Sequence, residues 1–342
     1  MTALRNLELQ EGPRPQLRPG WLRLDMVASA LGLTQLQILA GSTSTGGLPR
    51  VLGHEMVGRV TEVADGVQSP PLDSLVVVDC LFGCGRCVRC LDGSEVICAD
   101  YRMIGYTIDG GYAEEVVVPA ANAFELPPET PPEEAVLLAS ALPSAVRAVR
   151  RAGVVPGDRV VVVGGGSVGA LIAQIARVQG ATAVVGDVDR GRLESLRDHV
   201  DGTVLLGEDE PIESSRVRLL AAAGADRGAD VAFEVAGTQG ALDLALALVR
   251  AGGTLLAAGL PPGPLAFPSR TVRDAVLQEV TIRGSFAYSR TDFPRVVDLY
   301  RSGRLDLRSV TSEVVRLEDV SATVERMWQE GTGGKRHPVL IA

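Results

Sequence analysis

The feature that most constrains the fold is an apolar strand that runs straight into a glycine-rich turn. The stretch RVVVVGGGSVG begins at Arg159 and carries glycines at Gly164, Gly166 and Gly169. Glycines at this spacing allow a tight turn, a close approach of a pyrophosphate to the backbone, and close packing of a helix on a strand. A helix that starts at Ser167 and Val168 would direct its N-terminal amides at that pyrophosphate. The stretch therefore predicts the opening of a dinucleotide-binding domain.

A second predicted strand, TAVVG, leads directly into Asp187. In dinucleotide-binding domains, the acidic residue that hydrogen-bonds the adenosine ribose lies roughly 20 residues after the glycine motif. The spacing from Gly169 to Asp187 is close to this. A negative charge there repels a 2′-phosphate, so we expect NAD(H) to be preferred over NADP(H). Arg190 and Arg192 lie just beyond, either near enough to weaken this preference or as solvated charges on a surface helix.

The pattern of predicted secondary structure changes twice along the chain. Short β-rich runs broken by Gly and Pro extend to about residue 125, and a helical stretch follows at 135–152. Strands and helices then alternate to about Phe286, which is typical of a parallel sheet covered on both faces. The last part carries two amphipathic helices and the apolar run VLIA. We expect an α/β protein with a mostly β domain (1–143 and 287–342) and a doubly wound Rossmann domain (144–286).

Four closely spaced cysteines predict a structural metal site. Cys84, Cys87, Cys90 and Cys98 have the form C-x2-C-x2-C-x7-C in a polar loop at about 80–100. Four thiolates give the closed tetrahedral coordination of structural zinc. Such a site does no chemistry, and its metal stabilises a loop with too few apolar residues to fold against a core.

Composition and charge exclude several kinds of partner. The chain has 42 acidic and 33 basic residues, a formal charge of −9 and no basic cluster that would follow a phosphate backbone. It has neither a long apolar segment nor an apolar leader at its start. All 5 cysteines fall between Cys80 and Cys98, which favours metal binding in a reducing compartment over disulfides. We expect a cytoplasmic protein that binds neither nucleic acid nor membrane.

Two further motifs extend these features to most of the chain. They are GHEMVGRV at Gly53–Val60 and DGGYAEEVVVP at Asp109–Pro119. Together with the cysteine loop and the glycine turn, they follow one another along the chain in the order found in a known family. With them the chain resembles the zinc-type alcohol dehydrogenases of the medium-chain dehydrogenase/reductase family. The resemblance implies a GroES-like, mostly β domain built from both chain ends, a Rossmann domain between them, and an active site in the cleft.

The resemblance also implies three ligands of a catalytic zinc, and only one is present. Gly32 stands where the family has its first cysteine, and a shift of the alignment would put Ala40 there instead. His54 is intact and precedes Glu55, the carboxylate behind the metal, whereas Ser140 replaces the third ligand. A neutral hydroxyl is a poor zinc ligand and a lone imidazole does not hold zinc. We therefore expect one structural zinc per chain and no catalytic zinc.

Without that metal, other groups must carry the charge that develops on the substrate oxygen. The resemblance places Thr34 at the hydroxyl of the proton relay and Gln37 at the relay histidine. The catalytic candidates are thus Thr34, His54 and Glu55. Thr34 would donate a hydrogen bond to the substrate oxygen, and His54 beside Glu55 would be the acid/base group behind it. His54 and Thr34 could instead be structural residues. Cys80 is either a buried core thiol or a relocated ligand or proton donor facing His54.

The resemblance assigns the remaining cofactor contacts mainly to backbone. They are Val168 behind the nicotinamide, Val235, Ala258 and Leu260 along the sheet edge, Ser285 and Phe286 at the carboxamide, and His337 near the pyrophosphate. It also implies a homodimer or homotetramer paired through an edge strand at 280–286.

These features together predict an NAD(H)-dependent oxidoreductase that acts on a small alcohol or carbonyl compound, in specialised metabolism. A reductase of a conjugated C=C bond or an iminium is the first alternative, because such substrates need only a general acid. A non-catalytic dinucleotide-binding protein is the second.

Overall fold

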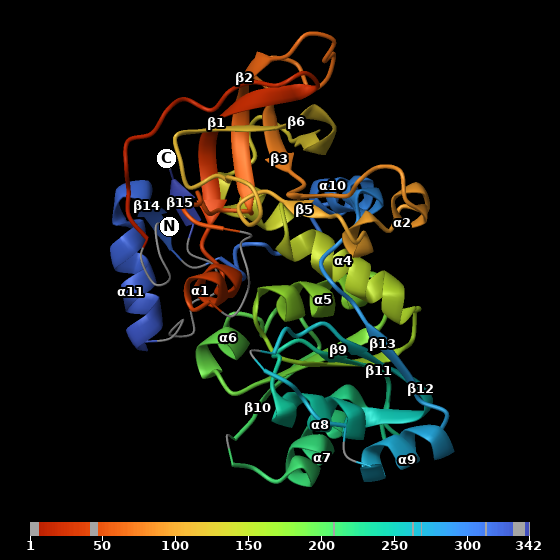
Figure 1. The fold of residues 1–342 in the computed structure, drawn as a ribbon. Helices are drawn as coiled ribbons and strands as arrows, with labels where there is room; N and C mark the ends of the chain where they lie inside the picture. Colours follow the sequence, from red (N-terminus) through yellow and green to blue (C-terminus); the bar gives the residue numbers. More distant parts are fainter. Residues whose placement is uncertain are drawn as a thin grey trace. The chain divides into compact units, whose positions relative to one another are not determined.

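The computed structural model describes residues 7–41, 47–207, 209–261, 263–267, 269–311, 313–330 and 339–341. The chain divides into two compact units (Figure 1). Unit 1 consists of Met1–Pro143, Tyr288–Val297 and Thr311–Ala342, and unit 2 consists of Ser144–Ala287 and Asp298–Val310. No helix among the described residues is long and apolar enough to span a membrane.

Unit 2 is built on a six-stranded sheet in the order β10-β9-β8-β11-β12-β13, and every neighbouring pair is parallel. The central strand β8 matches the predicted valine run and is buried from Val160 to Val163. A strand that is buried on both faces has apolar side chains at successive positions, which explains the valine run of β8. The strands are β8 (Arg159–Val163), β9 (Thr182–Asp187), β10 (Gly202–Leu205), β11 (Ala229–Glu234), β12 (Val249–Ala257) and β13 (Thr281–Gly284).

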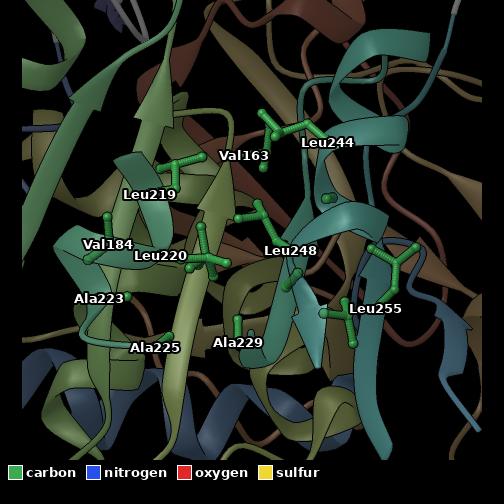
Figure 2. Close-up of a cluster of buried hydrophobic side chains, with 14 of the residues drawn as sticks. Val163, Val184, Leu219, Leu220, Ala223, Ala225, Ala229, Leu244, Leu248 and Leu255 are labelled. Carbon is green, nitrogen blue, oxygen red and sulfur yellow. The ribbon is translucent and has the colours of Figure 1, made fainter. Parts of the chain in front are cut away.

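Helices cover both faces of this sheet, α5 on one and α7 and α8 on the other (Figure 1). Side chains of α7 and α8 pack with strand residues such as Val163, Val184 and Leu255 in one buried cluster (Figure 2). The helices are α4 (Ala141–Ala152), α5 (Ser167–Val178), α6 (Arg190–Glu194), α7 (Ile212–Ala223), α8 (Gln239–Leu248) and α9 (Ser269–Leu277). The predicted doubly wound Rossmann architecture is confirmed.

Unit 2 also includes residues 298–310, which the sequence grouped with the first domain. The Gln174 side chain of α5 explains this placement, because it donates to Asp306 O at 3.0 Å and accepts from Asp306 N at 2.8 Å. Leu307 and Val310 of the same segment are buried.

Unit 1 is centred on the long strand β1, which pairs with three other strands. The sheet runs β14-β15-β1-β2-β3-β7, with β6 also on β1, and a separate pair β4-β5 carries the cysteine loop. The strands are β1 (Trp21–Ala30), β2 (Met56–Val63), β3 (Leu75–Val78), β4 (Leu81–Phe82), β5 (Arg102–Met103), β6 (Glu115–Pro119), β7 (Ala123–Glu125), β14 (Val314–Arg316) and β15 (Val339–Ile341). The C-terminal apolar run therefore returns to the first sheet, as predicted.

Short helices complete unit 1 and its core. Residues of α1 and α11 pack with Leu52, Tyr112 and Leu340 in a buried cluster. The α-helices are α1 (Leu33–Leu39), α2 (Val88–Leu91), α3 (Pro132–Ala135), α10 (Phe293–Arg301) and α11 (Val320–Glu330); the 3-10 turns are η1 (Glu95–Ile97), η2 (Ala120–Asn122), η3 (Val136–Leu138), η4 (Arg290–Asp292) and η5 (Leu317–Asp319).

The single helix predicted for 135–152 is interrupted. The turn η3 ends at Leu138, and α4 begins at Ala141. Pro143 accounts for the break, because a proline inside a continuous helix lacks its N–H and clashes with the carbonyl four residues earlier, here that of Ala139. In the first turn of a new helix the same residue is tolerated. Ser140 lies at the interruption.

Candidate active site and metal centre

The central strands of unit 2 define a place for a nucleotide. From β8 the chain moves to β9 and β10 on one side of the sheet, then crosses to β11, β12 and β13 on the other. In open parallel sheets, ligands bind at the carboxyl ends of the strands, at the point where the strand order reverses. Gly164 follows β8 and Val235 follows β11, so the structure brings these two candidates to that point.

The three glycines of the turn differ in what they make possible. A Cβ on Gly169 would lie 1.9 Å from the carbonyl oxygen of Gly164, and Gly164 itself has a φ of +113°. A Cβ on Gly166 would meet nothing within 4 Å. Gly164 and Gly169 therefore permit the close strand–turn–helix packing, whereas Gly166, the N-cap of α5, leaves space in front of the helix. Ser167 and Val168 form the first turn of α5, the first buried and the second half-buried.

Asp187 lies at the end of β9 with its carboxylate turned toward the glycine turn. Its Oδ2 accepts from Gly165 N at 2.5 Å and its Oδ1 accepts from Asp189 N at 2.8 Å. Arg192 Nη1 lies 3.6 Å from Asp187 Oδ2, on the short helix α6 that Asp189 caps. The structure thus groups Asp187 and Arg192 beside the turn and leaves Arg190 exposed.

A buried carboxylate that the sequence did not reveal shapes the next turn. Glu234, the last residue of β11, accepts from Ala236 N at 2.8 Å and from Gly237 N at 2.6 Å, and burial raises its pKa. A Cβ on Gly237 would lie 2.9 Å from Leu260 O, and Ala258 N donates to Glu234 O at 2.8 Å. Glu234 therefore holds together the segments that contain the candidates Val235, Ala258 and Leu260. Its position at the end of a strand, three residues before a glycine, was the available signal.

Ser285 and Phe286 follow the edge strand β13. The backbone N–H of Ser285 donates to Ala257 O at 2.9 Å, which extends the pairing of β12 with β13. The Ser285 Oγ is buried and has no hydrogen-bond partner among the described residues. The Phe286 ring is partly exposed. His337, the remaining cofactor candidate, lies outside the described residues.

The four cysteines of the loop converge on one point in unit 1. Their Sγ atoms all lie within 4.8 Å of one another, with 3.6 Å between Cys87 and Cys90 and 3.8 Å between Cys87 and Cys98. A zinc–sulfur distance of about 2.3 Å implies sulfur–sulfur separations of about 3.8 Å in a tetrahedron. Backbone amides of Arg86 and Cys87 lower the pKa of Cys84 to about 6, which favours the thiolate. The cluster fits a structural zinc.

The cysteine lobe is held by a buried polar network. The Arg290 guanidinium donates to Asn122 Oδ1 at 2.6 Å and lies 3.8 Å from Asp79 Oδ2. Asn122 in turn donates to the carbonyls of Asp79 and Leu81, and Glu95 accepts from Arg290 N. Burial raises the pKa of Asp79 to about 7, against the opposing effects of Leu81 N–H and Arg290. The network links Glu95 of the lobe to Arg290, which lies 195 residues later.

His54 is the centre of a second buried group in unit 1. It is 4% exposed, and its Nδ1 contacts the Nε2 of Gln35, a fully buried residue of α1. Thr34 precedes Gln35 in α1 and is half-buried. Glu55 is buried as well, and its carbonyl accepts from Ser29 Oγ at 2.7 Å. The structure therefore brings His54 to Gln35, a partner that the sequence did not single out.

The glycine-rich motif DGGY supports the segment that carries His54. Gly111 N and Tyr112 N donate to Gly53 O and Leu52 O, both at 2.9 Å. A Cβ on Gly110 would lie 2.2 Å from Gly53 O, so only glycine permits this approach. The two motifs that carried the resemblance are thus one packed unit of backbone, which fixes His54 in place.

Cys80 does not join the cysteine cluster. Its buried Sγ lies 3.1 Å from the hydroxyl of Tyr288, and burial together with the nearby charge of Asp79 raises its pKa. A thiol in this environment stays protonated, which is the behaviour of a core residue.

Two positions that the resemblance pairs with His54 as metal ligands carry no strong metal-binding side chain. Gly32, at the N-cap of α1, offers no side-chain ligand, and Ser140 offers only a neutral hydroxyl. Among the described residues, the four-cysteine cluster is the only group of three or more His, Cys, Asp or Glu side chains placed to hold an ion.

Comparisons with known proteins agree with both units. Residues 18–128 match the family described as the alcohol dehydrogenase GroES-like domain, and residues 167–302 match the zinc-binding dehydrogenase family. The chain is 30% identical over 332 residues to the alcohol dehydrogenase of Geobacillus stearothermophilus, covering 96% of this chain and 94% of the relative. The chain belongs to the zinc-type alcohol dehydrogenases of the medium-chain dehydrogenase/reductase family. This dehydrogenase is therefore an oxidoreductase, as the sequence predicted.

Other relatives widen the range of chemistry in the family. The dehydrogenase is 29% identical to D-xylulose reductase A of Aspergillus niger, over 86% of this chain and 80% of the relative. The solved alcohol dehydrogenase TADH from Thermus sp. ATN1 superposes with a TM-score of 0.88 at 26% identity, covering 100% of this chain and 98% of that one. The predicted fold class and family are both confirmed.

Proposed function

We propose that this dehydrogenase transfers hydride between NAD(H) and a small alcohol or carbonyl compound without a catalytic zinc. The observation that carries the proposal is the donor set around His54, where glycine and serine replace ligands and the described residues provide no second metal-binding cluster. The intact glycine turn and Asp187 support continued use of the cofactor. The structural zinc is retained in the cysteine lobe.

The residues of unit 2 bind and orient the dinucleotide. The amides of Ser167, Val168 and Gly169 at the start of α5 bind the pyrophosphate, and the space in front of Gly166 admits it. When bound, the nicotinamide supplies or accepts the hydride. The buried Ser285 Oγ is available to hydrogen-bond the carboxamide, with Val235, Ala258, Leu260 and Phe286 completing its surroundings.

Unit 1 stabilises the substrate oxygen. Thr34 and His54 donate hydrogen bonds to it, and Glu55 follows His54 in the chain as the carboxylate of this group. Two positioned donors replace the electrostatic effect that a metal supplies in the zinc-dependent relatives. Removal of one such donor costs roughly 10²- to 10³-fold in kcat, so we expect losses of that order for Thr34→Val and His54→Asn.

The experiment that tests the central claim is the zinc content per chain, measured by elemental analysis on protein purified without added metal or chelator. About one zinc per chain supports the proposal. About two would contradict it and would make His54 and Glu55 ligands of an unconventional centre. Stopped-flow oxidation of NADH with aldehydes, ketones, enones and iminium ions then identifies the reaction. Turnover of only conjugated or iminium substrates would favour C=C or iminium reduction, and binding of NADH without any turnover would favour a non-catalytic protein.

Cofactor choice follows from Asp187. Its buried carboxylate faces the glycine turn and repels a 2′-phosphate, so NAD(H) is preferred although Arg192 is close. A hydrogen bond to a charged group contributes about 1.5–3 kcal/mol. We therefore expect Asp187→Ser to weaken NADH binding about 10-fold or more and to improve the relative affinity for NADPH, as measured by fluorescence titration. An unchanged preference would contradict this assignment.

The edge of the unit 2 sheet provides a surface for a second copy of the chain. Strand β13 is exposed on its outer side and next to a groove of about 550 Å³ lined by Phe267, Val272, Val276 and Ile282, among others. An exposed edge strand is a template for pairing through its outward backbone N–H and C=O groups. We expect a homodimer, or a tetramer built from such dimers, through β13 and α9. The reduced cysteines are consistent with a cytoplasmic location.

A further inference from the structure

Gln35 makes two contacts that together determine the state of His54. Its side-chain Oε1 accepts a hydrogen bond from the backbone N–H of Gly32 at 2.9 Å, and its Nε2 contacts His54 Nδ1. Gln35 is 0% exposed and His54 is 4% exposed, so water does not compete at either end. The two residues come from separate segments, the first turn of α1 and the loop before β2.

The contact with Gly32 decides which way the amide faces. A backbone N–H is always a donor, so only the oxygen of the amide can accept from it. Rotating the amide by half a turn would place its NH2 group against the N–H of Gly32 and leave two buried donors facing each other, which is unfavourable. The NH2 group of Gln35 therefore faces His54.

A donor facing Nδ1 requires a lone pair on Nδ1. We infer that Gln35 is a positioning residue that keeps His54 a neutral imidazole with its hydrogen on Nε2. The imidazolium and the other neutral form both carry a hydrogen on Nδ1 and would set N–H against NH2. In the form that remains, the lone pair of Nδ1 is used by Gln35 and Nε2 is a donor. The ring then has no lone pair for a metal ion, since zinc binds histidine through a nitrogen lone pair.

This inference deepens the proposed function and, in its catalytic part, rests on it. A neutral imidazole that donates from Nε2 stabilises negative charge on a substrate oxygen by a hydrogen bond alone. The ring keeps its hydrogen throughout, and the proton that completes the alcohol comes from water. His54 is then a hydrogen-bond donor rather than the acid/base group that we expected from the sequence.

The test reads the position of the hydrogen directly. In protein labelled with ¹⁵N-histidine, long-range ¹H–¹⁵N correlation spectra distinguish protonated from unprotonated ring nitrogens, and the 3 histidines of the chain give three patterns. His199→Gln and His337→Gln assign His54 by elimination, so no variant of His54 is needed. We expect hydrogen on Nε2 in the unaltered enzyme. Hydrogen on Nδ1 would overturn the inference.

Gln35→Glu keeps the shape of the side chain but replaces the NH2 donor that faces His54 with an acceptor oxygen. A carboxylate can still accept from Gly32 N–H but can only accept from His54, so the hydrogen should move to Nδ1. Gln16→Glu makes the same chemical change at an exposed position and should leave the pattern of His54 unaltered. Circular dichroism shows whether Gln35→Glu keeps its fold. If the folded variant gives the same His54 pattern as the unaltered enzyme, the inference is also overturned.

Kinetics separates this inference from the proposed function. With Nε2 turned into an acceptor, Gln35→Glu should lower kcat by about 10²-fold or more while the Kd for NADH stays within about twofold. If the hydrogen moves as expected but neither Gln35→Glu nor His54→Asn alters kcat, the tautomer assignment stands and the catalytic role of His54 fails. If the hydrogen is on Nδ1 in the unaltered enzyme, the tautomer assignment fails whatever the kinetics.

Discussion

At the scale of single residues, the glycines of the cofactor turn give a matched pair of tests. Gly169→Ala would put a Cβ 1.9 Å from Gly164 O, whereas Gly166→Ala would put one in open space with an ordinary φ of −63°. We expect Gly169→Ala to lower the stability of the fold by about 3 kcal/mol or more, the cost of a forced backbone shift. Gly166→Ala should have the same urea midpoint as the unaltered enzyme. It should bind NADH at least about 10-fold more weakly, because its methyl group occupies the approach of the pyrophosphate. Equal urea midpoints for the two variants would contradict this division of roles.

Asp79 makes stability depend on pH in a direction that is unusual for a carboxyl group. Its pKa is raised from 3.8 to about 7, mainly by burial and further by Glu95, and Arg290 offsets only part of this. The folded state therefore binds the proton more tightly than the unfolded state, and stability falls as pH rises from about 4 to 7 and is level above that. At about 1.4 kcal/mol for each pKa unit, the loss is about 4 kcal/mol.

The same argument predicts the behaviour of Asp79→Asn. Because asparagine does not ionise, the variant should gain about 3 kcal/mol relative to the unaltered enzyme between pH 4.5 and pH 8. Urea unfolding at both pH values measures the difference, with the exposed Asp65→Asn as the control. A difference between enzyme and variant that does not change with pH would show that Asp79 is ionised throughout.

At the scale of elements, the cysteine lobe depends on its metal. Cys98→Ser removes one of four converging ligands, so we expect a zinc content well below one per chain and a Tm lower by about 5 °C or more. Cys80→Ser removes the remaining thiol, whose Sγ contacts Tyr288 instead, and should leave the zinc content unchanged. Zinc lost in Cys80→Ser would make that residue a ligand.

The elements that the sequence predicted well are those defined by neighbours in the chain. The valine run of β8 and the cysteine loop have their decisive residues within one short segment, so spacing alone was informative. The interruption at Ser140 was missed because apolar periodicity outweighed one proline. Gln35 and Glu234 were missed because their partners depend on how separate segments pack, which periodicity does not describe. The assignments of Thr34, His54 and Glu55 to catalysis stay predictions.

At the scale of the whole molecule, the exposed edge of the unit 2 sheet should control assembly. Val276 on α9 is 71% exposed and Ile282 on β13 is 43% exposed, both beside the same groove. A charge at a self-paired surface meets its own copy, so Val276→Glu and Ile282→Lys should each shift the enzyme toward monomer by at least about 10-fold in dimer Kd. Analytical ultracentrifugation measures this, and Val217→Glu on α7 is the control for an exposed valine elsewhere. Unaltered sedimentation of both edge variants would place the interface on another surface.

The pairing of β1 with β15 has a consequence for the order in which the enzyme is made. Ala28 lies opposite Ile341, so the first sheet closes only after the strand that carries Ile341 has left the ribosome. The strands of unit 2 all lie between Arg159 and Gly284 and pair among themselves. Because long-range pairing is slow and a nascent domain folds as a unit, we expect unit 2 to become protease-resistant on stalled chains while the first sheet still awaits its last strand. Under the proposed function, the unit that binds the cofactor would thus be folded in the cell before the unit that acts on the substrate.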